Sequence, residues 1–400
     1  MPLLEFFQGI YAFFVVAPHV AGARLFLIAL GFAFTYLGYR KILEPILMVP
    51  MGIGMVGVNG GLMVYEAGHI GTLFLNPMIS NLEELMQVLQ IDFLQPIYTF
   101  AFSNGLIACL VFMGIGAMTE IDYLLARPFM SFFIAACAEL GTILTLPIGL
   151  ALGLPPNEAA AIAIVGGADG PMVLFGSLMM AKELFVPITV VAYIYLSICY
   201  GGFPFLARIV PKRLRGVEMD WRTIPKVSRG AKFAFAVIAC GLLCLLFPVA
   251  APLFASFFLG LAIKEAAIEG YIEFLTRPLL YGATLFLGFT LGALLGVDVI
   301  LNPKVLLLLL LGMLALVLSG IGGLVGGLIY HGISKEPFNP LIGIAGVSCV
   351  PTTAKVAQKC AAEANKRAMI LPFAMGPCVA GVVTTAIVLG LYMTGIPLIR

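Results

Sequence analysis

The chain has 400 residues, of which 62% are hydrophobic and 10% are charged. A soluble globular domain carries about 25% charged residues, so this composition excludes an ordinary soluble protein and indicates an integral membrane protein with several spans. The formal net charge of +2 gives no indication of a nucleic-acid partner.

The eight cysteines lie mostly in apolar runs, with no CxxC pair and no histidine at metal-ligand spacing. We therefore expect buried free thiols, and neither a disulfide framework nor a zinc site. No cleavable signal peptide is expected, because the first apolar residues follow Met-Pro without a basic start.

The N-terminal quarter of the chain predicts two membrane segments and a more polar stretch. Residues 1–22 could form an interfacial helix or a first span, and residues 25–39 are apolar enough to cross the membrane. Residues 44–61 are rich in glycine and contain two prolines, so we expect a bent or re-entrant segment there. Residues 66–95 are more polar and predict a surface helix.

The middle of the chain alternates spans with one strongly basic connection. Residues 96–118, 128–154 and 185–206 predict spans, and the second contains Glu139 near its centre. Residues 208–232 carry eight basic and two acidic side chains. By the positive-inside rule we expect this loop to be cytoplasmic.

The C-terminal part repeats this alternation. Residues 233–262 predict one long span or two short ones broken at prolines, and residues 279–297, 305–330 and 371–392 predict further spans, with a polar helix over residues 352–367. The sequence therefore predicts an all-α polytopic membrane protein. We expect one integral membrane domain, residues 1–400, with about nine transmembrane helices plus re-entrant or broken helices.

One short motif, GGADGP at residues 166–171, interrupts the apolar run of residues 159–181, in which Asp169 is the one ionisable residue. A lone carboxylate at membrane depth is costly and indicates a functional site. Three glycines and a proline break a helix, which frees carbonyl oxygens, and backbone of that kind is tolerated in a membrane where it lines a cavity or is buried. Carboxylate and carbonyl oxygens suit a hard cation such as sodium. Alternatively, Asp169 caps the helix that restarts at Pro171, and the two roles can coexist.

The two halves of the chain resemble each other at regular offsets. Gly114 matches Gly288 at an offset of 174, and Pro171 matches Pro351 at an offset of 180. We therefore expect two structural repeats, residues 97–206 and 271–392. Paired broken helices in inverted repeats are typical of secondary transporters, whose ion site lies where the repeats meet.

The counterpart of the first motif is NPLIGIAGVSCVP at residues 339–351. Asn339 offers an amide oxygen, Ser348 a hydroxyl, and Gly343 weakens the helix so that carbonyls can be exposed. Tyr195, in the span after the first motif, could add a phenol. The alternatives are a helix cap for Asn339, a serine bonded to its own helix for Ser348 and an interfacial aromatic for Tyr195.

Both motifs together resemble the β subunit of sodium-pumping, biotin-dependent decarboxylases, the family that serves oxaloacetate, methylmalonyl-CoA, glutaconyl-CoA and malonate decarboxylase complexes. The resemblance rests on GGADGP at 166–171 with AYIY at 192–195, and on NPLIG at 339–343 with AGVS at 345–348. Further matches are FMGIGAMT at 112–119 and AMGP at 374–377, and the resemblance covers nearly the whole chain.

The resemblance implies a carboxybiotin decarboxylase subunit in a bacterial inner membrane. Carboxybiotin, carried by a partner subunit, would be decarboxylated at this chain in a proton-consuming step that drives Na+ outward. The implied partners are biotin-carrier and carboxyltransferase subunits and a small γ-type membrane subunit, in an oligomeric complex. The implied ion or coupling residues are Asp169, Tyr195, Asn339, Gly343 and Ser348.

Three positions depart from the family pattern. Lys355 stands where the family has an arginine, so it keeps the charge but loses the planar fork that would hold carboxybiotin at two points. Cys378 replaces an asparagine and removes an oxygen ligand, and Glu139 replaces an expected glutamine and adds a second buried carboxylate. These changes leave open an altered ion stoichiometry, a proton in place of sodium, or a paralogue with a changed substrate.

Two other functions compete with the decarboxylase interpretation. One is a stand-alone secondary transporter of a cation or a carboxylate, and the other is a channel-like or structural scaffold. The chain has no Met-Lys-Met biotin-acceptor motif and no ATP-binding GxxxxGK[ST] loop, so its energy must come from a partner or a gradient. Asp169, Tyr195 and Lys355 are the residues expected to act in catalysis or coupling.

Overall fold

The protein is described here from a computed structural model that covers residues 6–64, 70–77, 82–220, 222, 224–349 and 351–399. The contacts between residues divide the chain into two compact units. One unit comprises Met1–Ile107 and Tyr281–Leu307, and the other comprises Ala108–Leu280 and Leu308–Arg400. The second unit contains every predicted site residue.

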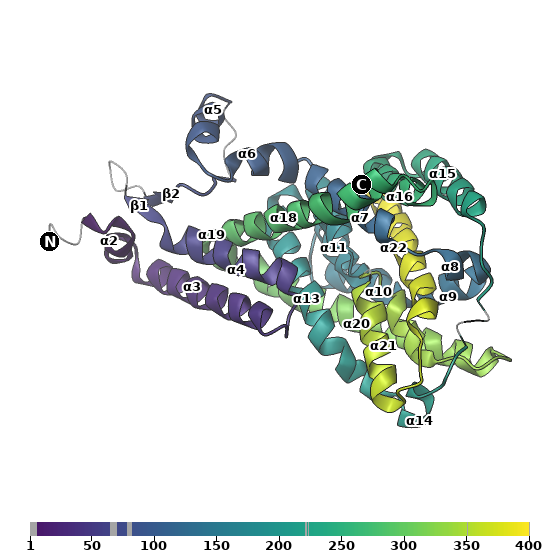
Figure 1. The fold of residues 1–400 in the computed structure, drawn as a ribbon. Helices are drawn as coiled ribbons and strands as arrows, with labels where there is room; N and C mark the ends of the chain where they lie inside the picture. The colour runs from purple at the N-terminus through teal and green to yellow at the C-terminus, as the bar shows by residue number, and fades with distance from the viewer. Residues whose placement is uncertain are drawn as a thin grey trace. The chain divides into compact units, whose positions relative to one another are not determined.

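Most of the described chain is helical, which confirms the predicted all-α membrane class (Figure 1). Within the described residues, seven helices are long and apolar enough to cross a membrane, and an eighth span results if the bent pair Gln95–Phe102 and Leu106–Met118 counts as one. The helix α13 (Phe185–Ile209) has 25 residues, which also exceeds the thickness of a bilayer core, about 20 residues. The expected number of about nine transmembrane helices stays a prediction.

The first unit contains a helical hairpin, a small sheet and short helices. In chain order its helices are α2 (Gln8–Val15), α3 (Pro18–Tyr39), α4 (Pro45–Gly60), α5 (Leu82–Ile91), α6 (Gln95–Ile97), the π-helix η2 (Tyr98–Phe102), α18 (Leu280–Leu294) and α19 (Val297–Ile300). The strands β1 (Leu62–Val64) and β2 (Ile70–Thr72) pair antiparallel, with Leu62 opposite Thr72. The predicted surface helix over residues 66–95 is therefore only partly correct, because α5 occupies ten residues of it and β2 another three; residues 66–69 and 78–81 lie outside the described part.

The first part of the second unit contains a 24-residue span and the first interrupted helix. Its elements up to the basic loop are α7 (Leu106–Met118), α8 (Asp122–Ala126), α9 (Pro128–Ala138), α10 (Leu140–Ala151), α11 (Pro156–Ala163), the 3-10 turn η3 (Ile164–Gly167), α12 (Gly170–Met180), η4 (Lys182–Leu184), α13 and α14 (Lys212–Arg215). The helices α9 and α10 form one span of 24 residues, with Glu139 between them.

The rest of the second unit contains a hairpin, a 31-residue helix and the second interruption. Its elements are α15 (Arg229–Leu246), η6 (Pro248–Ala250), α16 (Ala251–Glu265), α17 (Glu269–Phe274), the π-helix η7 (Leu275–Leu279), α20 (Pro303–Ile333), the 3-10 segment η8 (Pro340–Gly346), α21 (Thr352–Ala364) and α22 (Leu371–Ile399). Of the two forms that the sequence left open for residues 233–262, the structure has two helices, with the break at η6. The predicted polar helix over residues 352–367 is α21.

The order of elements recurs along the chain. Two series of elements have the same order. The first series is α7, α8, α9–α10, the helix interrupted at η3, and α13. The second series is α18, α19, α20, the segment interrupted after η8, and α22. A helical hairpin precedes each series, α3–α4 before the first and α15–α16 before the second.

Close helix contacts at glycines recur in the same way. In the first unit a Cβ on Gly54 would collide with the carbonyl of Phe289, and in the second unit a Cβ on Gly260 would collide with that of Met113. Each hairpin therefore packs against one helix through glycines that let the backbones approach.

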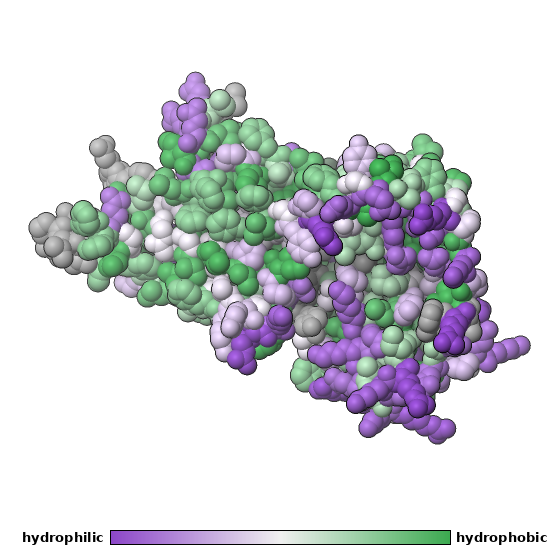
Figure 2. Space-filling model, in the orientation of Figure 1, coloured by the Kyte–Doolittle hydropathy of each residue, from purple (hydrophilic) through white to green (hydrophobic). Residues whose placement is uncertain are grey.

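Polar and apolar residues separate clearly on the surface of the second unit. Large apolar side chains such as Phe129 and Leu245, which are 81% and 83% exposed, cover its helices, as expected for lipid-facing positions. Hydrophilic residues gather around α14 and α21 (Figure 2). This polar region adjoins the basic loop, whose Gly216 carbonyl accepts a hydrogen bond from the Asn365 amide at 3.0 Å.

Candidate functional site

The first interruption places Asp169 at the start of α12. Gly166 and Gly167 end the turn η3, and Ala168 has a left-handed backbone with φ of 55°. Asp169 is the N-cap of α12, where its carboxylate accepts a hydrogen bond from the Met172 N–H at 3.3 Å, and it is 5% exposed. The capping alternative is therefore correct, and it leaves most of the carboxylate's accepting capacity unused.

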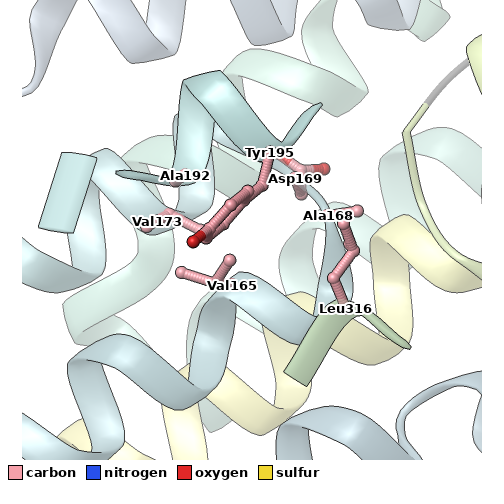
Figure 3. A pocket seen from close by; sticks show the side chains of 7 residues that line it. All are labelled: Val165, Ala168, Asp169, Val173, Ala192, Tyr195 and Leu316. Carbon is pink, nitrogen blue, oxygen red and sulfur yellow. The ribbon is translucent and has the colours of Figure 1, made fainter. Parts of the chain in front are cut away.

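A narrow pocket lies beside Asp169 (Figure 3). Its lining, which is apolar apart from the carboxylate and one phenol, consists of Val165, Ala168, Asp169, Val173, Ala192, Tyr195 and Leu316. The pocket has no room for a free water molecule, so in this conformation the carboxylate is shielded from solvent.

Tyr195 reaches this pocket from α13 but turns its hydroxyl away from the carboxylate, toward Val165 and Val173 (Figure 3). Its Oη donates to the backbone carbonyl of Leu309 on α20, at 2.5 Å. Tyr195 is 5% exposed, so it is not the interfacial aromatic that was the alternative. Its ring brings α13 and α20 together around Asp169.

Ser348 joins the two interruptions. Its backbone N–H and its hydroxyl both donate to the carbonyl of Gly167, at 3.0 and 2.6 Å, and that carbonyl lies two residues before Asp169. The hydroxyl does not bond within its own helix, so the alternative of a helix-bonded serine is wrong. A Cβ on Gly167 would meet the side chain of Thr385, which explains why glycine is needed at this junction.

Two residues of α22 complete the polar cluster and are not among those predicted from the sequence. Thr385 Oγ1 lies 3.3 Å from Ser348 Oγ, and the Thr385 hydroxyl is also hydrogen-bonded to Oε1 of Glu139. Thr384 donates to the same oxygen at 3.4 Å. The signal that could have found them is a pair of adjacent hydroxyls in the apolar middle of α22, together with a lone glutamate in another span.

Asn339 is fully buried and joins η8 to the basic loop. Its Oδ1 caps η8 by accepting from the Leu341 N–H at 3.0 Å. Its amide group donates to the carbonyls of Arg215 and Val217 at 2.8 and 3.0 Å. Both ends of the amide are therefore engaged in holding backbone, as the capping alternative requires.

Gly343 lies where η8 crosses α20. A Cβ there would collide with the carbonyl of Gly323 and meet the Cα of Gly327 at 3.0 Å. These close neighbours belong to α20, so the structure gives Gly343 a packing role and does not place it with Asp169.

Lys355 lies on α21 and is exposed. The helix α21 packs against both α13 and η8, so it continues from the second interruption toward the polar surface around α14. The structure thus separates the predicted residues into three groups: Asp169, Ser348 and Tyr195 near one another, Asn339 and Gly343 along η8, and Lys355 at the surface.

A buried carboxylate between two interrupted helices can exchange a proton for a small monovalent cation. Burial makes an isolated charge costly, so the carboxylate is stabilised either by a proton or by a cation. Fold and site together define a multi-pass membrane protein of the ion-transporting class.

Comparison with known proteins identifies the family. Residues 23–396 match the profile of the Na+-transporting oxaloacetate decarboxylase beta subunit. The chain is 53% identical over 393 residues to the carboxybiotin decarboxylase of Malonomonas rubra, covering 98% of each chain. It is 32% identical over 373 residues to the methylmalonyl-CoA decarboxylase subunit beta of Propionigenium modestum, covering 90% of this chain and 92% of that one. It is 31% identical over 419 residues to an oxaloacetate decarboxylase beta chain of Salmonella typhi, covering 94% and 95%.

The chain therefore belongs to the family of β subunits of Na+-transporting decarboxylases, as the resemblance of its two motifs implied. It is the membrane subunit of a decarboxylase sodium pump.

Proposed function

We propose that this chain decarboxylates carboxybiotin presented by a partner subunit and couples that step to outward movement of Na+ at Asp169. The observation that carries the proposal is the position of Asp169, a buried carboxylate two residues from the carbonyl that Ser348 binds. The sodium ion is cargo in this scheme and carboxybiotin is the substrate.

The proposed coupling is an exchange of a proton for sodium. Decarboxylation breaks the bond between the biotin nitrogen and the carboxylate carbon, so CO2 leaves and the nitrogen takes up one proton. A sodium ion that arrives beside the neutral Asp169 favours loss of the carboxyl proton, because a cation stabilises the charged form. The proton released there supplies the one that biotin consumes, so chemistry and ion binding depend on each other.

The roles of the other predicted residues follow from their contacts. Ser348 is the second oxygen donor at the junction, since its hydroxyl already lies there. We assign Asn339 and Gly343 a positioning role, because one holds backbone carbonyls and the other permits the close crossing of η8 and α20. Tyr195 keeps the pocket beside Asp169 closed. A ligand role for Tyr195, Asn339 or Gly343 stays a prediction.

We propose Lys355 as the residue that receives the carboxylate of carboxybiotin. It is an exposed cation at the surface, on the helix that follows the second interruption. Lysine offers a point charge in place of a planar fork, so it holds the carboxylate by attraction more than by two parallel hydrogen bonds.

The proposed orientation places α14 and α21 on the cytoplasmic side of a bacterial inner membrane, because the basic loop lies there. A biotin carrier and a carboxyltransferase would then approach Lys355 from the cytoplasm, and a small γ-type membrane subunit would complete the oligomeric complex. The choice of acid belongs to the carboxyltransferase.

We further propose that the recurring element order reflects two structural repeats of inverted topology. They extend beyond residues 97–206 and 271–392, because a hairpin precedes each series and makes the same kind of glycine contact. In such an arrangement the two interrupted helices are equivalent elements of the two repeats, which accounts for their meeting at one site.

The test is sodium uptake by liposomes that contain the purified complex. Addition of the acid substrate should drive uptake of labelled Na+, and avidin should abolish it. Asp169→Asn should abolish both uptake and Na+-dependent decarboxylation, whereas Glu183→Gln, which changes an exposed carboxylate, should leave both intact. Uptake that survives avidin, or that needs no biotinylated partner, would favour a stand-alone transporter instead.

A further inference from the structure

Glu139 is the second buried carboxylate of the site, and its hydrogen bonding is incomplete. It is 3% exposed and lies between α9 and α10 in the middle of a span. Oε1 is bonded to Thr385, but Oε2 is buried and has no hydrogen-bond partner among the described residues. A charged carboxylate with one bare oxygen at this depth is strongly disfavoured.

The polar contacts around Glu139 also require one more hydrogen than the hydroxyls supply. Three contacts form a chain: Glu139 to Thr385, Thr385 to Ser348, and Ser348 to the Gly167 carbonyl. Each hydroxyl has one hydrogen, so Thr385 and Ser348 provide two. All three contacts are hydrogen bonds when the carboxyl of Glu139 carries a proton and donates it to Thr385.

A second unpaired oxygen lies beside this carboxyl. The hydroxyl of Thr142, one turn further along α10, is fully buried, interacts with the Glu139 carboxyl and has no hydrogen-bond partner of good geometry within the described chain. A carboxylate oxygen and a hydroxyl oxygen, both unused, are ligands that a hard monovalent cation accepts.

A pocket at one end of the span comes close to this position through Tyr392. It has a volume of about 270 Å³ and is lined by Asn157, Met180, Tyr392 and Ile396, among others. The Tyr392 hydroxyl donates to the backbone carbonyl of Thr142 at 3.1 Å. Asn365, which lies shortly before the start of α22, donates to the Gly216 carbonyl of the basic loop, and the pocket is lined by residues at the opposite end of α22. In the orientation proposed above, the pocket therefore opens on the outer side.

We propose that Glu139 is a second exchange site, neutral in this conformation, where a monovalent cation on its way to the outer pocket replaces the carboxyl proton. On exchange the O–H bond of the carboxyl breaks, the proton passes to water in the pocket, and the cation binds Oε2 of Glu139 and the Thr142 hydroxyl. After loss of that proton, Thr385 donates to Glu139 and Ser348 still donates to Gly167, so the hydrogen bond between Thr385 and Ser348 is lost. Occupancy of Glu139 therefore alters the bonding of Ser348, the residue that joins the two interruptions.

The titratable groups that act electrostatically on this position are Asp169 and the phenol of Tyr392. A negatively charged Asp169 would disfavour a second negative charge at Glu139. Two carboxylates that exchange protons for cations in turn fit an outward path better than two that are charged together. This inference rests on the proposed function, which places the inner exchange at Asp169.

Infrared difference spectroscopy of the purified complex in lipid tests the inference without any activity measurement. Replacing choline by Na+ should remove carbonyl bands of two neutral carboxyl groups. One band should be missing in Asp169→Asn and the other in Glu139→Gln, whose neutral amide can bond Thr385 in the same place. Ile396→Trp, which fills the pocket, should slow loss of the Glu139 band without removing it.

The outcomes separate the two proposals. A difference spectrum of Glu139→Gln identical to that of the original protein overturns the second site, while a spectrum unchanged by Asp169→Asn contradicts the proposed function instead. Absence of any carboxyl band contradicts proton exchange at Glu139 and at Asp169 alike. If Glu139→Gln does not fold, Thr385→Val serves, because removal of its hydroxyl should shift the Glu139 band; an unshifted band overturns the hydrogen-bond chain.

Discussion

Ser348 binds the carbonyl of Gly167 twice, once through its backbone N–H and once through its hydroxyl, although the two residues are 181 positions apart. Two donors satisfy both lone pairs of that carbonyl. The junction between the interrupted helices is thus closed in this conformation, and the Ser348 hydroxyl oxygen lies at the junction where we propose that it binds the cation with Asp169.

Ser348→Ala should weaken sodium binding, because the hydroxyl that we propose as the second oxygen ligand is lost, and it should moderately destabilise the junction. The backbone bond to Gly167 remains, so we expect a loss of about 1 kcal/mol of stability, the usual value for one hydrogen bond. Thermal unfolding and the sodium dependence of decarboxylation measure the two effects. Ser177→Ala is the matched control, because that serine is also buried and donates to a backbone carbonyl, at 3.1 Å from Leu174; an equal sodium effect in both variants would contradict the role of Ser348.

Part of this junction could be predicted from the sequence because its signals are local. Three glycines and a proline around Asp169 break a helix wherever they occur, and a lone carboxylate in an apolar run indicates a site. The recurring Gly and Pro offsets indicated the partner segment, and the pairing of Ser348 with the first motif follows from it.

The rest of the site depends on contacts that no local pattern encodes. Thr385 reaches Glu139 across 246 positions, and the amide of Asn339 holds carbonyls more than 120 positions away. The direction of the Tyr195 hydroxyl is set by the Leu309 carbonyl on another helix. Gly343 resembled an ion ligand in the sequence because glycine exposes carbonyls, whereas its close neighbour is the backbone of α20.

Gly343→Ala should reduce stability more than it alters sodium affinity. The added methyl would meet backbone atoms of Gly323 and Gly327, which cannot rotate away, so η8 and α20 must separate. Overpacking of this kind costs roughly 1–3 kcal/mol. The melting temperature in detergent measures it, with Gly241→Ala as control, since a Cβ there meets nothing within 4 Å. A normal melting temperature together with lost sodium dependence would instead support the original ligand role.

Asn339→Asp should loosen the basic loop while keeping the cap of η8. The carboxylate still accepts from the Leu341 N–H, but it cannot donate to the carbonyls of Arg215 and Val217. We expect trypsin to cleave after Arg213 or Arg215 several times faster than in the original protein. Asn302→Ala, which removes an exposed cap at Lys304, is the control and should not change cleavage. Unchanged cleavage in Asn339→Asp would show that other contacts hold the loop.

Lys355→Ala should lower the rate of carboxybiotin decarboxylation without changing stability. The side chain is exposed, so its removal leaves no cavity. Lys355→Arg should restore or increase the rate, because the guanidinium can hold a carboxylate at two points. The measurement is decarboxylation at saturating sodium, with Lys366→Ala as the exposed control. Equal rates in the two alanine variants would remove Lys355 from the proposed docking site.

Lys232→Met should destabilise the second unit strongly. The ammonium group lies 3.1 Å from Asp122 and 3.2 Å from Glu265, and the Glu265 side chain is 3% exposed. Removing the cation leaves a buried carboxylate unpaired, which costs roughly 3–5 kcal/mol. Adding Glu265→Gln should recover most of that loss, because the unpaired charge is gone. Thermal unfolding measures both variants, and Lys226→Met, at an exposed position of the same loop, should melt normally. If the double variant melts no higher than Lys232→Met alone, the buried charge is not the cause, and the lost packing of the lysine stem between α15 and its neighbours accounts for the destabilisation.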